Sequence, residues 1–185
     1  MKFVEPIKDE EQVKDMMEYL QKRNNRDFVM FNLGISCGLR IGDILPLRVR
    51  DVRGKNFLTI HEQKTGKTRD IAISPKLKRI LDDYTADKDP RDFLFTSRVK
   101  NRRGKPKPIS REQAYKILRN AANAIGFDGR VGTHTMRKTF GYRYYMKYGN
   151  LAQLKKIFNH REENITMAYI GLEKQEIDKN ITELW

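Results

Sequence analysis

The sequence of 185 residues holds a single cysteine, Cys37, so no disulfide can form within the chain. Such cysteine usage agrees with a reducing compartment. Cys37 follows an apolar stretch, and we expect it to pack as a small hydrophobic side chain rather than to act in catalysis. No run of 18 or more apolar residues is present, and residues 1–6 show no charged-then-apolar leader. We therefore expect neither a membrane span nor a secretion signal, with a cytoplasmic location as the default.

Length and charge set the next bounds. The 38% hydrophobic content supports a folded core, and the length fits one domain of residues 1–185. Residues 28–172 hold 30 basic and 13 acidic side chains, whereas residues 1–27 and 173–185 are each more acidic than basic. A positive field of this size steers association with nucleic acid and makes binding sensitive to salt. A basic surface without a partner is the alternative.

Hydrophobic periodicity and end signals predict a mixed α/β fold that is mainly α-helical and has a small antiparallel β-sheet. No internal repeat is evident. The expected helices cover residues 9–23, 28–37, a segment after Pro75, 110–124, 133–148 with Thr133 as N-cap, and 151–158 with a left-handed Asn159 after it. The expected strands are 57–60 and 69–73, joined by a turn at 64–67.

One segment, residues 98–108, is strongly basic and contains no acidic side chain. With one glycine and two prolines it is not expected to form a regular element. Its basic residues are Arg98, Lys100, Arg102, Arg103, Lys105 and Lys107. We predict a flexible clamp for the DNA backbone that orders on binding, and a solvated basic loop is the alternative.

Six residues with complementary chemistry follow one another in short motifs. Arg40 lies in Cys-Gly-Leu-Arg-Ile-Gly-Asp, Lys64 in Gln-Lys-Thr-Gly-Lys-Thr-Arg, His134 and Arg137 in Gly-Thr-His-Thr-Met-Arg, His160 in Ile-Phe-Asn-His, and Tyr169 in Thr-Met-Ala-Tyr. Arginines bind non-bridging phosphate oxygens, histidines exchange protons, a lysine protonates a leaving alkoxide, and a phenol supplies a nucleophile. These are the parts needed for a tyrosine to attack a phosphodiester, and no metal or other cofactor is required.

The order and spacing of these motifs resemble the catalytic domain of the tyrosine recombinases, the phage-integrase family, whose pattern runs Arg, Asp/Glu, Lys, His-x-x-Arg, His/Trp, Tyr. The match covers about Phe28 to Gly171, with 24 residues from Arg40 to Lys64 and nine from His160 to Tyr169. The resemblance implies the fold of that domain. It also implies a site-specific recombinase or integrase that cleaves and rejoins double-stranded DNA through a covalent 3′-phosphotyrosine.

The resemblance also implies a role for each motif residue. Arg40 and Arg137 would bind the scissile phosphate, and Lys64 would protonate the departing 5′ oxygen. His134 and His160 would be the proton acceptor and a phosphate donor. Asp43 would orient the arginines and a histidine without touching the substrate itself.

Family resemblance bears on assembly as well. It implies a tetramer on DNA, with a monomer in free solution left open, and no contact with a membrane. Residues 170–185 would form a tail that docks on a neighbouring protomer, docking on the same chain being the alternative. We do not expect the family's N-terminal core-binding or arm-binding domain in residues 1–185.

Two other functions are open on the same residues. A type IB topoisomerase shares this chemistry and relaxes supercoils, and a non-catalytic DNA-binding regulator could retain the fold.

The chain also departs from the usual family pattern. Asn159 replaces a glycine, Arg161 and Glu162 stand where small residues are usual, and Lys138 stands where histidine is frequent. None of these departures removes a catalytic group.

Overall fold

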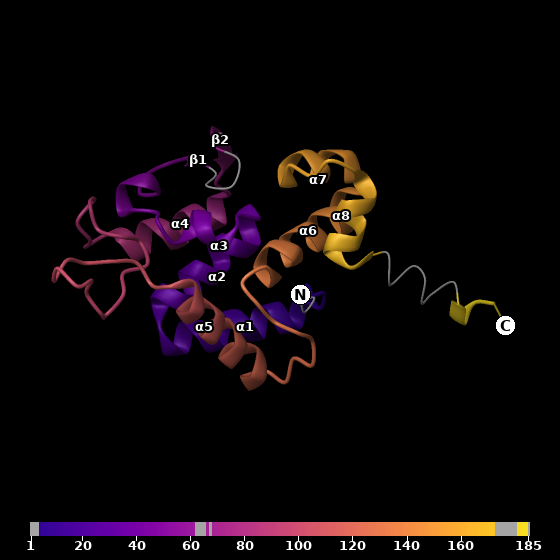
Figure 1. Cartoon of the computed structure of the whole chain (residues 1–185), viewed down its shortest axis with the longest axis horizontal. Coiled ribbons are helices and arrows are strands. Elements are labelled where there is room, and N and C mark those ends of the chain that lie inside the picture. The colour runs from indigo at the N-terminus through magenta and orange to yellow at the C-terminus, as the bar shows by residue number, and fades with distance from the viewer. Residues whose placement is uncertain (1–3, 62–65, 67, 173–180, 185) are drawn as a thin grey trace.

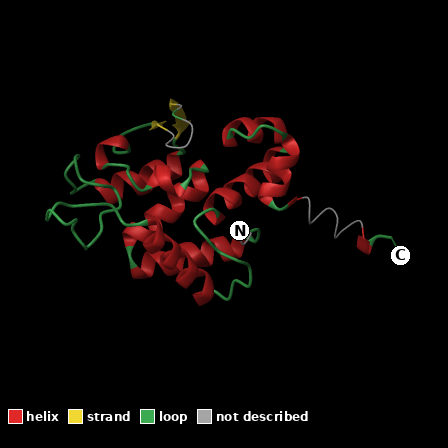
Figure 2. Cartoon of the chain, in the orientation of Figure 1, coloured by secondary structure: helices red, strands yellow, loops and turns green. Residues whose placement is uncertain are grey.

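The computed structural model describes residues 4–61, 66, 68–172 and 181–184. Figures 1 and 2 show a mainly helical molecule with one small sheet, which confirms the predicted fold class. The described elements are α1 (Glu10–Arg23), α2 (Asn25–Cys37), α3 (Ile41–Ile44), the 3-10 helix η1 (Val49–Asp51), β1 (Phe57–His61), β2 (Thr68–Ala72), α4 (Pro75–Thr85), α5 (Arg111–Ala124), α6 (Thr135–Tyr148), α7 (Leu151–Phe158) and α8 (Glu163–Ile170). None of the described helices is long and apolar enough to cross a bilayer.

Helix α2 is the centre of the main core. Its residues Val29, Met30, Phe31 and Leu33 are fully buried, as expected for a helix that is apolar on all sides. The helix begins three residues earlier than predicted because the Asn24 side chain accepts a hydrogen bond from the backbone N–H of Arg26 at 3.0 Å. It ends at Cys37, as predicted, and is followed by Gly38 with a left-handed φ of 61°.

The sheet consists of two antiparallel strands. Phe57 pairs with Ala72 and His61 with Thr68, so β1 and β2 align over five residues each. Leu58 and Ile60 point into the main core, whereas Phe57 is 60% exposed on the other face. This alternation confirms the predicted hairpin strands. The predicted turn that carries Lys64 lies outside the described residues.

Helix α6 joins the main core to a second, smaller core. It packs against α2 and also against α7 and α8, as Figure 1 shows. The smaller core consists of Leu154, Phe158 and Ile170. Gly141 allows the close approach, because a Cβ at that position would lie 2.6 Å from the Ile170 side chain. The first half of α6 is therefore enclosed on several sides.

The predicted cap of α6 is wrong by one residue. The helix begins at Thr135, and His134 is its N-cap, without a capping hydrogen bond from the imidazole. The hydroxyl of Thr135 instead accepts from the backbone N–H of Gly132 at 3.1 Å. The imidazole of His134 contacts Tyr169 instead of capping the helix. No local sequence signal predicts this contact.

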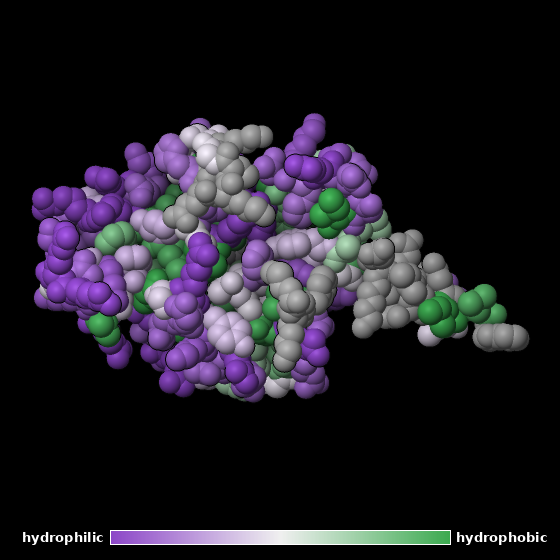
Figure 3. Space-filling model, viewed as in Figure 1, coloured by the Kyte–Doolittle hydropathy of each residue, from purple (hydrophilic) through white to green (hydrophobic). Residues whose placement is uncertain are grey.

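The basic segment 98–108 is irregular, as predicted, and its two arms are hydrogen-bonded to each other. The backbone N–H of Ser97 donates to the Lys107 carbonyl at 2.8 Å, and that of Asn101 donates to the Lys105 carbonyl at 2.9 Å. The Asn101 side chain also accepts from two backbone N–H groups of the turn. These bonds give the segment a defined course, and Figure 3 shows a mostly hydrophilic surface at this end of the molecule.

Candidate active site

Tyr169 is the penultimate residue of α8, and the end of that helix is fixed on both sides. Ile170 is fully buried in the small core. Gly171 closes the helix with a φ of 75°, and its carbonyl accepts a hydrogen bond from Lys8 Nζ at 3.2 Å. The backbone that carries the tyrosine is therefore tied to the N-terminal segment as well as to α6 and α7.

The ring of Tyr169 lies among other rings and one cation. His160 and Phe158 meet it edge-on, with centroid distances of 5.2 and 5.5 Å. The Nζ of Lys138 lies 4.9 Å from the Tyr169 ring centroid. These neighbours come from α6, α7 and the segment after α7, so the ring is packed from three directions.

The hydroxyl of Tyr169 is hydrogen-bonded to His134, with 3.0 Å between Nδ1 and Oη. Burial raises the pKa of Tyr169, and this effect exceeds the opposing charges of Arg137 and Arg40 and a hydrogen bond from Arg137. The phenol is consequently protonated at neutral pH. Nucleophilic attack therefore needs a proton acceptor, and the His134 ring nitrogen is within reach of that proton.

Arg137 is 1% exposed and is held by main-chain oxygens. One terminal nitrogen donates to the Gly38 carbonyl, and the other donates to the Phe158 carbonyl at 3.0 Å. The guanidinium also stacks on the Phe158 ring, with 4.3 Å from Cζ to the centroid. A planar five-donor group fixed in this way is preorganised for an anion.

Arg40 comes from a different element than Arg137, as the N-cap of α3. Its charge acts on Tyr169 in the same direction as that of Arg137. Asp43 follows one turn later in α3, where it is 8% exposed. The two arginines predicted from separate motifs thus converge on one phenol, and Asp43 lies in the helix that begins at Arg40.

His160 is oriented by Thr166. Its Nδ1 lies 3.0 Å from Thr166 Oγ1, and that hydroxyl donates in turn to the Glu162 carbonyl at 3.4 Å. These two contacts fix the plane of the imidazole, and Nε2 is the ring nitrogen that does not contact Thr166.

Removing this hydroxyl gives a direct test of the arrangement. Thr166→Val keeps the side-chain volume but deletes the hydroxyl that is bonded to His160, so we expect the imidazole to lose its fixed orientation. For the strand cleavage that the sequence predicts, we expect a roughly tenfold lower rate, about the effect of one hydrogen bond. Single-turnover cleavage measures it, with Thr166→Ser as the control that keeps the hydroxyl. An unchanged rate in Thr166→Val would show that the Thr166 bond does not orient His160.

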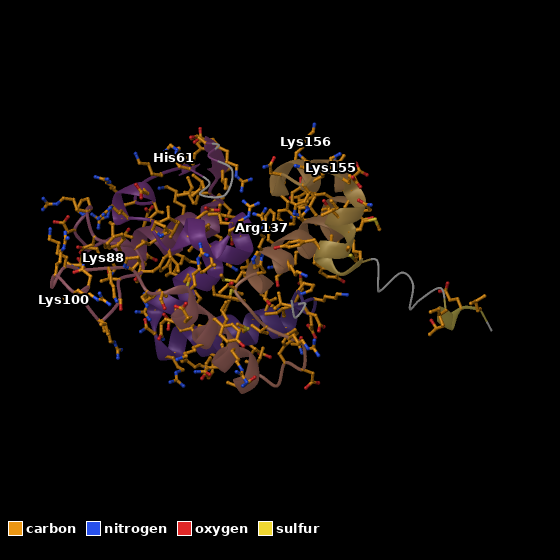
Figure 4. All side chains as sticks on the ribbon, in the orientation of Figure 1. His61, Lys88, Lys100, Arg137, Lys155 and Lys156 are labelled. Carbon is orange, nitrogen blue, oxygen red and sulfur yellow. The ribbon has the colours of Figure 1, made fainter. Side chains whose placement is uncertain are left out.

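Two sets of predicted site residues are not part of this cluster. Lys64 lies outside the part of the chain that the structure describes. The basic segment 98–108 is at another end of the molecule, as the labels of Arg137 and Lys100 in Figure 4 show. Among the described residues, no group of three or more His, Cys, Asp or Glu side chains is arranged to hold a metal ion.

Sequence reasoning missed part of the site. It did not assign roles to Lys138, Phe158 or the Gly38 carbonyl, all of which contact the catalytic candidates. Thr166 was visible only as part of the motif that ends at Tyr169. A signal for Lys138 existed in its position four residues after His134, since residues at that spacing share a helix face.

Comparison with known proteins agrees with this geometry. The family model described as "Phage integrase family" matches residues 8–176. The chain is 46% identical over 174 residues to the "Probable integrase/recombinase YoeC" of Bacillus subtilis (strain 168), and the match covers 94% of this chain and 93% of that protein. The chain therefore belongs to the phage integrase family, which confirms the resemblance seen in its motifs and the expectation of a tyrosine-type site-specific recombinase.

Solved structures confirm the fold. The structure of XerA recombinase matches with a TM-score of 0.73 at 19% identity, covering 99% of this chain and 66% of that one. A post-cleavage complex of XerH site-specific recombinase bound to its palindromic difH substrate matches with a TM-score of 0.72 at 18% identity, covering 98% of this chain and 53% of that one. The chain thus spans about half to two thirds of the length of these recombinases.

Proposed function

We propose that this chain cleaves and rejoins DNA at specific sites through a transient covalent bond between Tyr169 and a 3′ phosphate. The observation that carries the proposal is the hydrogen bond between the Tyr169 hydroxyl and His134 Nδ1, at a site where the charges of Arg137 and Arg40 act on the same phenol. A phenol with an acceptor and two guanidinium groups has the requirements of a phosphodiester nucleophile.

Cleavage would proceed as a substitution at phosphorus. The Tyr169 oxygen forms a bond to phosphorus while the bond from phosphorus to the 5′ oxygen breaks. The phenolic proton passes to His134, and Lys64 protonates the departing 5′ oxygen. Arg40, Arg137 and an Nε2–H of His160 would donate to the non-bridging oxygens, where negative charge concentrates in the transition state.

Rejoining is the reverse reaction. A 5′ hydroxyl attacks the phosphotyrosine and gives its proton to Lys64, the bond from phosphorus to Tyr169 breaks, and His134 returns the proton to the phenolic oxygen. One phosphodiester is lost and one is formed, so the exchange needs no ATP. Asp43 would keep Arg40 in place from within α3 during both steps.

DNA would be held by charge outside the catalytic pocket as well. The segment 98–108 has a defined course, and most of its basic side chains are exposed. Its geometry and charge suit contacts with the phosphate backbone, which position a duplex without reading its sequence. The DNA complex of XerH, which has the same fold, supports a duplex as the partner.

Recombination between two duplexes would require several protomers on DNA, and we propose a tetramer. Ile170 and Leu172 pack in the small core of this chain, so a segment that docks on a neighbour would begin after Leu172. Among the described residues beyond it, Ile181 and Leu184 are 58% and 71% exposed. These apolar side chains are suited to burial against another protomer.

The proposed function is tested by trapping the covalent intermediate on a substrate pool that contains many candidate sites. The pool is a library of nicked duplexes with randomised arms, from which the short 5′-hydroxyl fragment diffuses away after cleavage. We expect protein–DNA adducts that survive denaturation and carry a common sequence. Tyr169→Phe should give none while still binding the duplex. Adducts formed equally by Tyr169→Phe would assign the reaction to another nucleophile.

The same substrate separates this proposal from its rivals. Joining of two differently marked duplexes, each with the recovered site, is the expected outcome for a recombinase. Relaxation of a supercoiled plasmid without such joining would indicate a type IB topoisomerase. Binding without an adduct would indicate a regulator.

A further inference from the structure

Lys138 occupies an unusual place beside the nucleophile. Its Nζ lies 4.9 Å from the centroid of the Tyr169 ring, and the residue is only 3% exposed. Lys138 stands four residues after His134 on α6, so both side chains project toward Tyr169 from the same helix. His134 contacts the hydroxyl and Lys138 lies over the ring.

A lysine in this position is unfavourable for folding alone. Lysine is rarely buried, because its ammonium loses strong hydration when it leaves water. Burial lowers the pKa of Lys138 to about 8, with the charge of Glu5 opposing the shift. A methionine of similar length would fill the same space without this penalty. Burial thus opposes the charge of Lys138.

The charged and titratable groups around Tyr169 are mostly basic, whereas the charge that acts on Lys138 is acidic. Glu5 approaches from the N-terminal segment. Arg137 and His134 come from α6, Arg40 from the start of α3, and His160 from the segment after α7. A further cation on the ring face interacts more strongly with a phenolate than with a phenol, because the phenolate ring carries more negative charge. Lys138 is thus placed where negative charge develops during cleavage and rejoining.

We propose that Lys138 is a positioning residue for Tyr169, whose ammonium holds the ring and stabilises the negative charge that the phenolic oxygen carries as its bond to phosphorus forms or breaks. The inference rests on the proposed function and adds one residue to it. Lys138 itself transfers no proton in these steps, since the phenolic proton is exchanged with His134.

The test uses single-turnover adduct formation on the nicked half-site recovered by the library selection, from pH 6 to pH 9.5. We expect Lys138→Met to cleave about tenfold more slowly than the wild type at pH 7. The ratio of the two rates should fall toward one as pH rises past about 8, where Lys138 loses its charge. Lys138→Arg stays charged over the whole range and should keep most of the rate, with no such fall.

Lys147→Met is the matched control. Lys147 lies on the same helix, with its Nζ 5.4 Å from the ring centroid of Tyr148, but the residue is exposed and remote from Tyr169. This variant should match the wild-type rate at every pH. A loss of rate common to both lysine variants would reflect the overall charge of α6 and would overturn the inference.

Thermal stability provides a second readout, in which the charge of Lys138 is expected to lower stability although it raises the cleavage rate. The unfolded chain keeps a lysine pKa of 10.5, so between pH 8 and 10.5 the unfolded state binds more protons than the folded one. Wild-type stability should therefore gain from a rise in pH over this window. Lys138→Met should have a higher melting temperature than the wild type below pH 8, and the difference should disappear by about pH 10.5. A lower melting temperature in Lys138→Met would show a structural lysine and overturn the inference.

The outcomes separate the two proposals. If the wild type forms the adduct and Lys138→Met cleaves at the same rate, or at a rate ratio that is independent of pH, the role of Lys138 is wrong while the proposed function stands. If the wild type forms no adduct with any member of the library, both are wrong.

Discussion

Arg137→Lys is expected to lower the rate of strand cleavage by about a thousandfold, the upper range for removal of one transition-state donor. Lysine keeps a positive charge, but it cannot bond the Gly38 and Phe158 carbonyls at once while presenting further donors to a phosphate. The guanidinium also stacks on the Phe158 ring, and an ammonium replaces that contact poorly. The measurement is single-turnover adduct formation at saturating protein, with duplex binding followed separately by fluorescence anisotropy.

Arg143→Lys is the control for this substitution. Arg143 lies on the same helix, where its side chain is 41% exposed and forms an ion pair with Glu10 at 3.6 Å. We expect wild-type cleavage from Arg143→Lys, because exposed pairs contribute little. Cleavage by Arg137→Lys within tenfold of the wild type would mean that charge alone, and not the fixed fork of donors, is what the phosphate needs.

Gly38→Ala should destabilise the fold by about 2–4 kcal/mol and slow cleavage in the fraction that remains folded. Gly38 has a φ of 61°, and a Cβ there would lie 2.4 Å from the Phe140 ring. The backbone or the ring must move, and the Gly38 carbonyl that accepts from Arg137 moves with the backbone. Urea unfolding gives the stability change, and the adduct assay gives the catalytic effect.

A second glycine separates the two causes. Gly149 closes α6 with a φ of 63°, and a Cβ there meets nothing within 4 Å. Gly149→Ala therefore carries only the backbone strain, roughly 1–2 kcal/mol. Phe140→Leu in the Gly38→Ala background should restore part of the stability. If both alanine variants lose the same stability, crowding against Phe140 is absent and the coupling to Arg137 has no structural basis.

Local signals predicted much of the fold. The hairpin strands, the left-handed Gly38 and the left-handed Asn159, with a φ of 52°, were all readable from residue types with known backbone preferences. The cap of α6 was predicted at Thr133 instead of His134 because a threonine before a helix is normally its cap. Here the Thr135 hydroxyl, and not that of Thr133, accepts a local backbone N–H, from Gly132, and the imidazole of His134 contacts Tyr169, 35 residues further on.

The motif residues of the site were also predictable, but their orientation was not. Arg137 is directed by the carbonyls of Gly38 and Phe158, which are 99 and 21 residues away and leave no trace in its own motif. The burial of Lys138 could not be predicted either, because it also depends on contacts with distant parts of the chain. Helix α6 lies between two cores, so its first half is enclosed on several sides and does not show the apolar stripe of a surface helix.

Arg137 donates to two backbone carbonyl oxygens, and this affects which substitutions around it the site can tolerate. Every residue type carries a peptide oxygen, so replacing the side chain at Phe158 removes a stacking surface but leaves that anchor in place. The backbone conformation at the ends of α2 and α7 therefore sets the direction of the guanidinium. Attempts to redirect this arginine by engineering should reshape those two helix ends rather than search for a new side-chain partner.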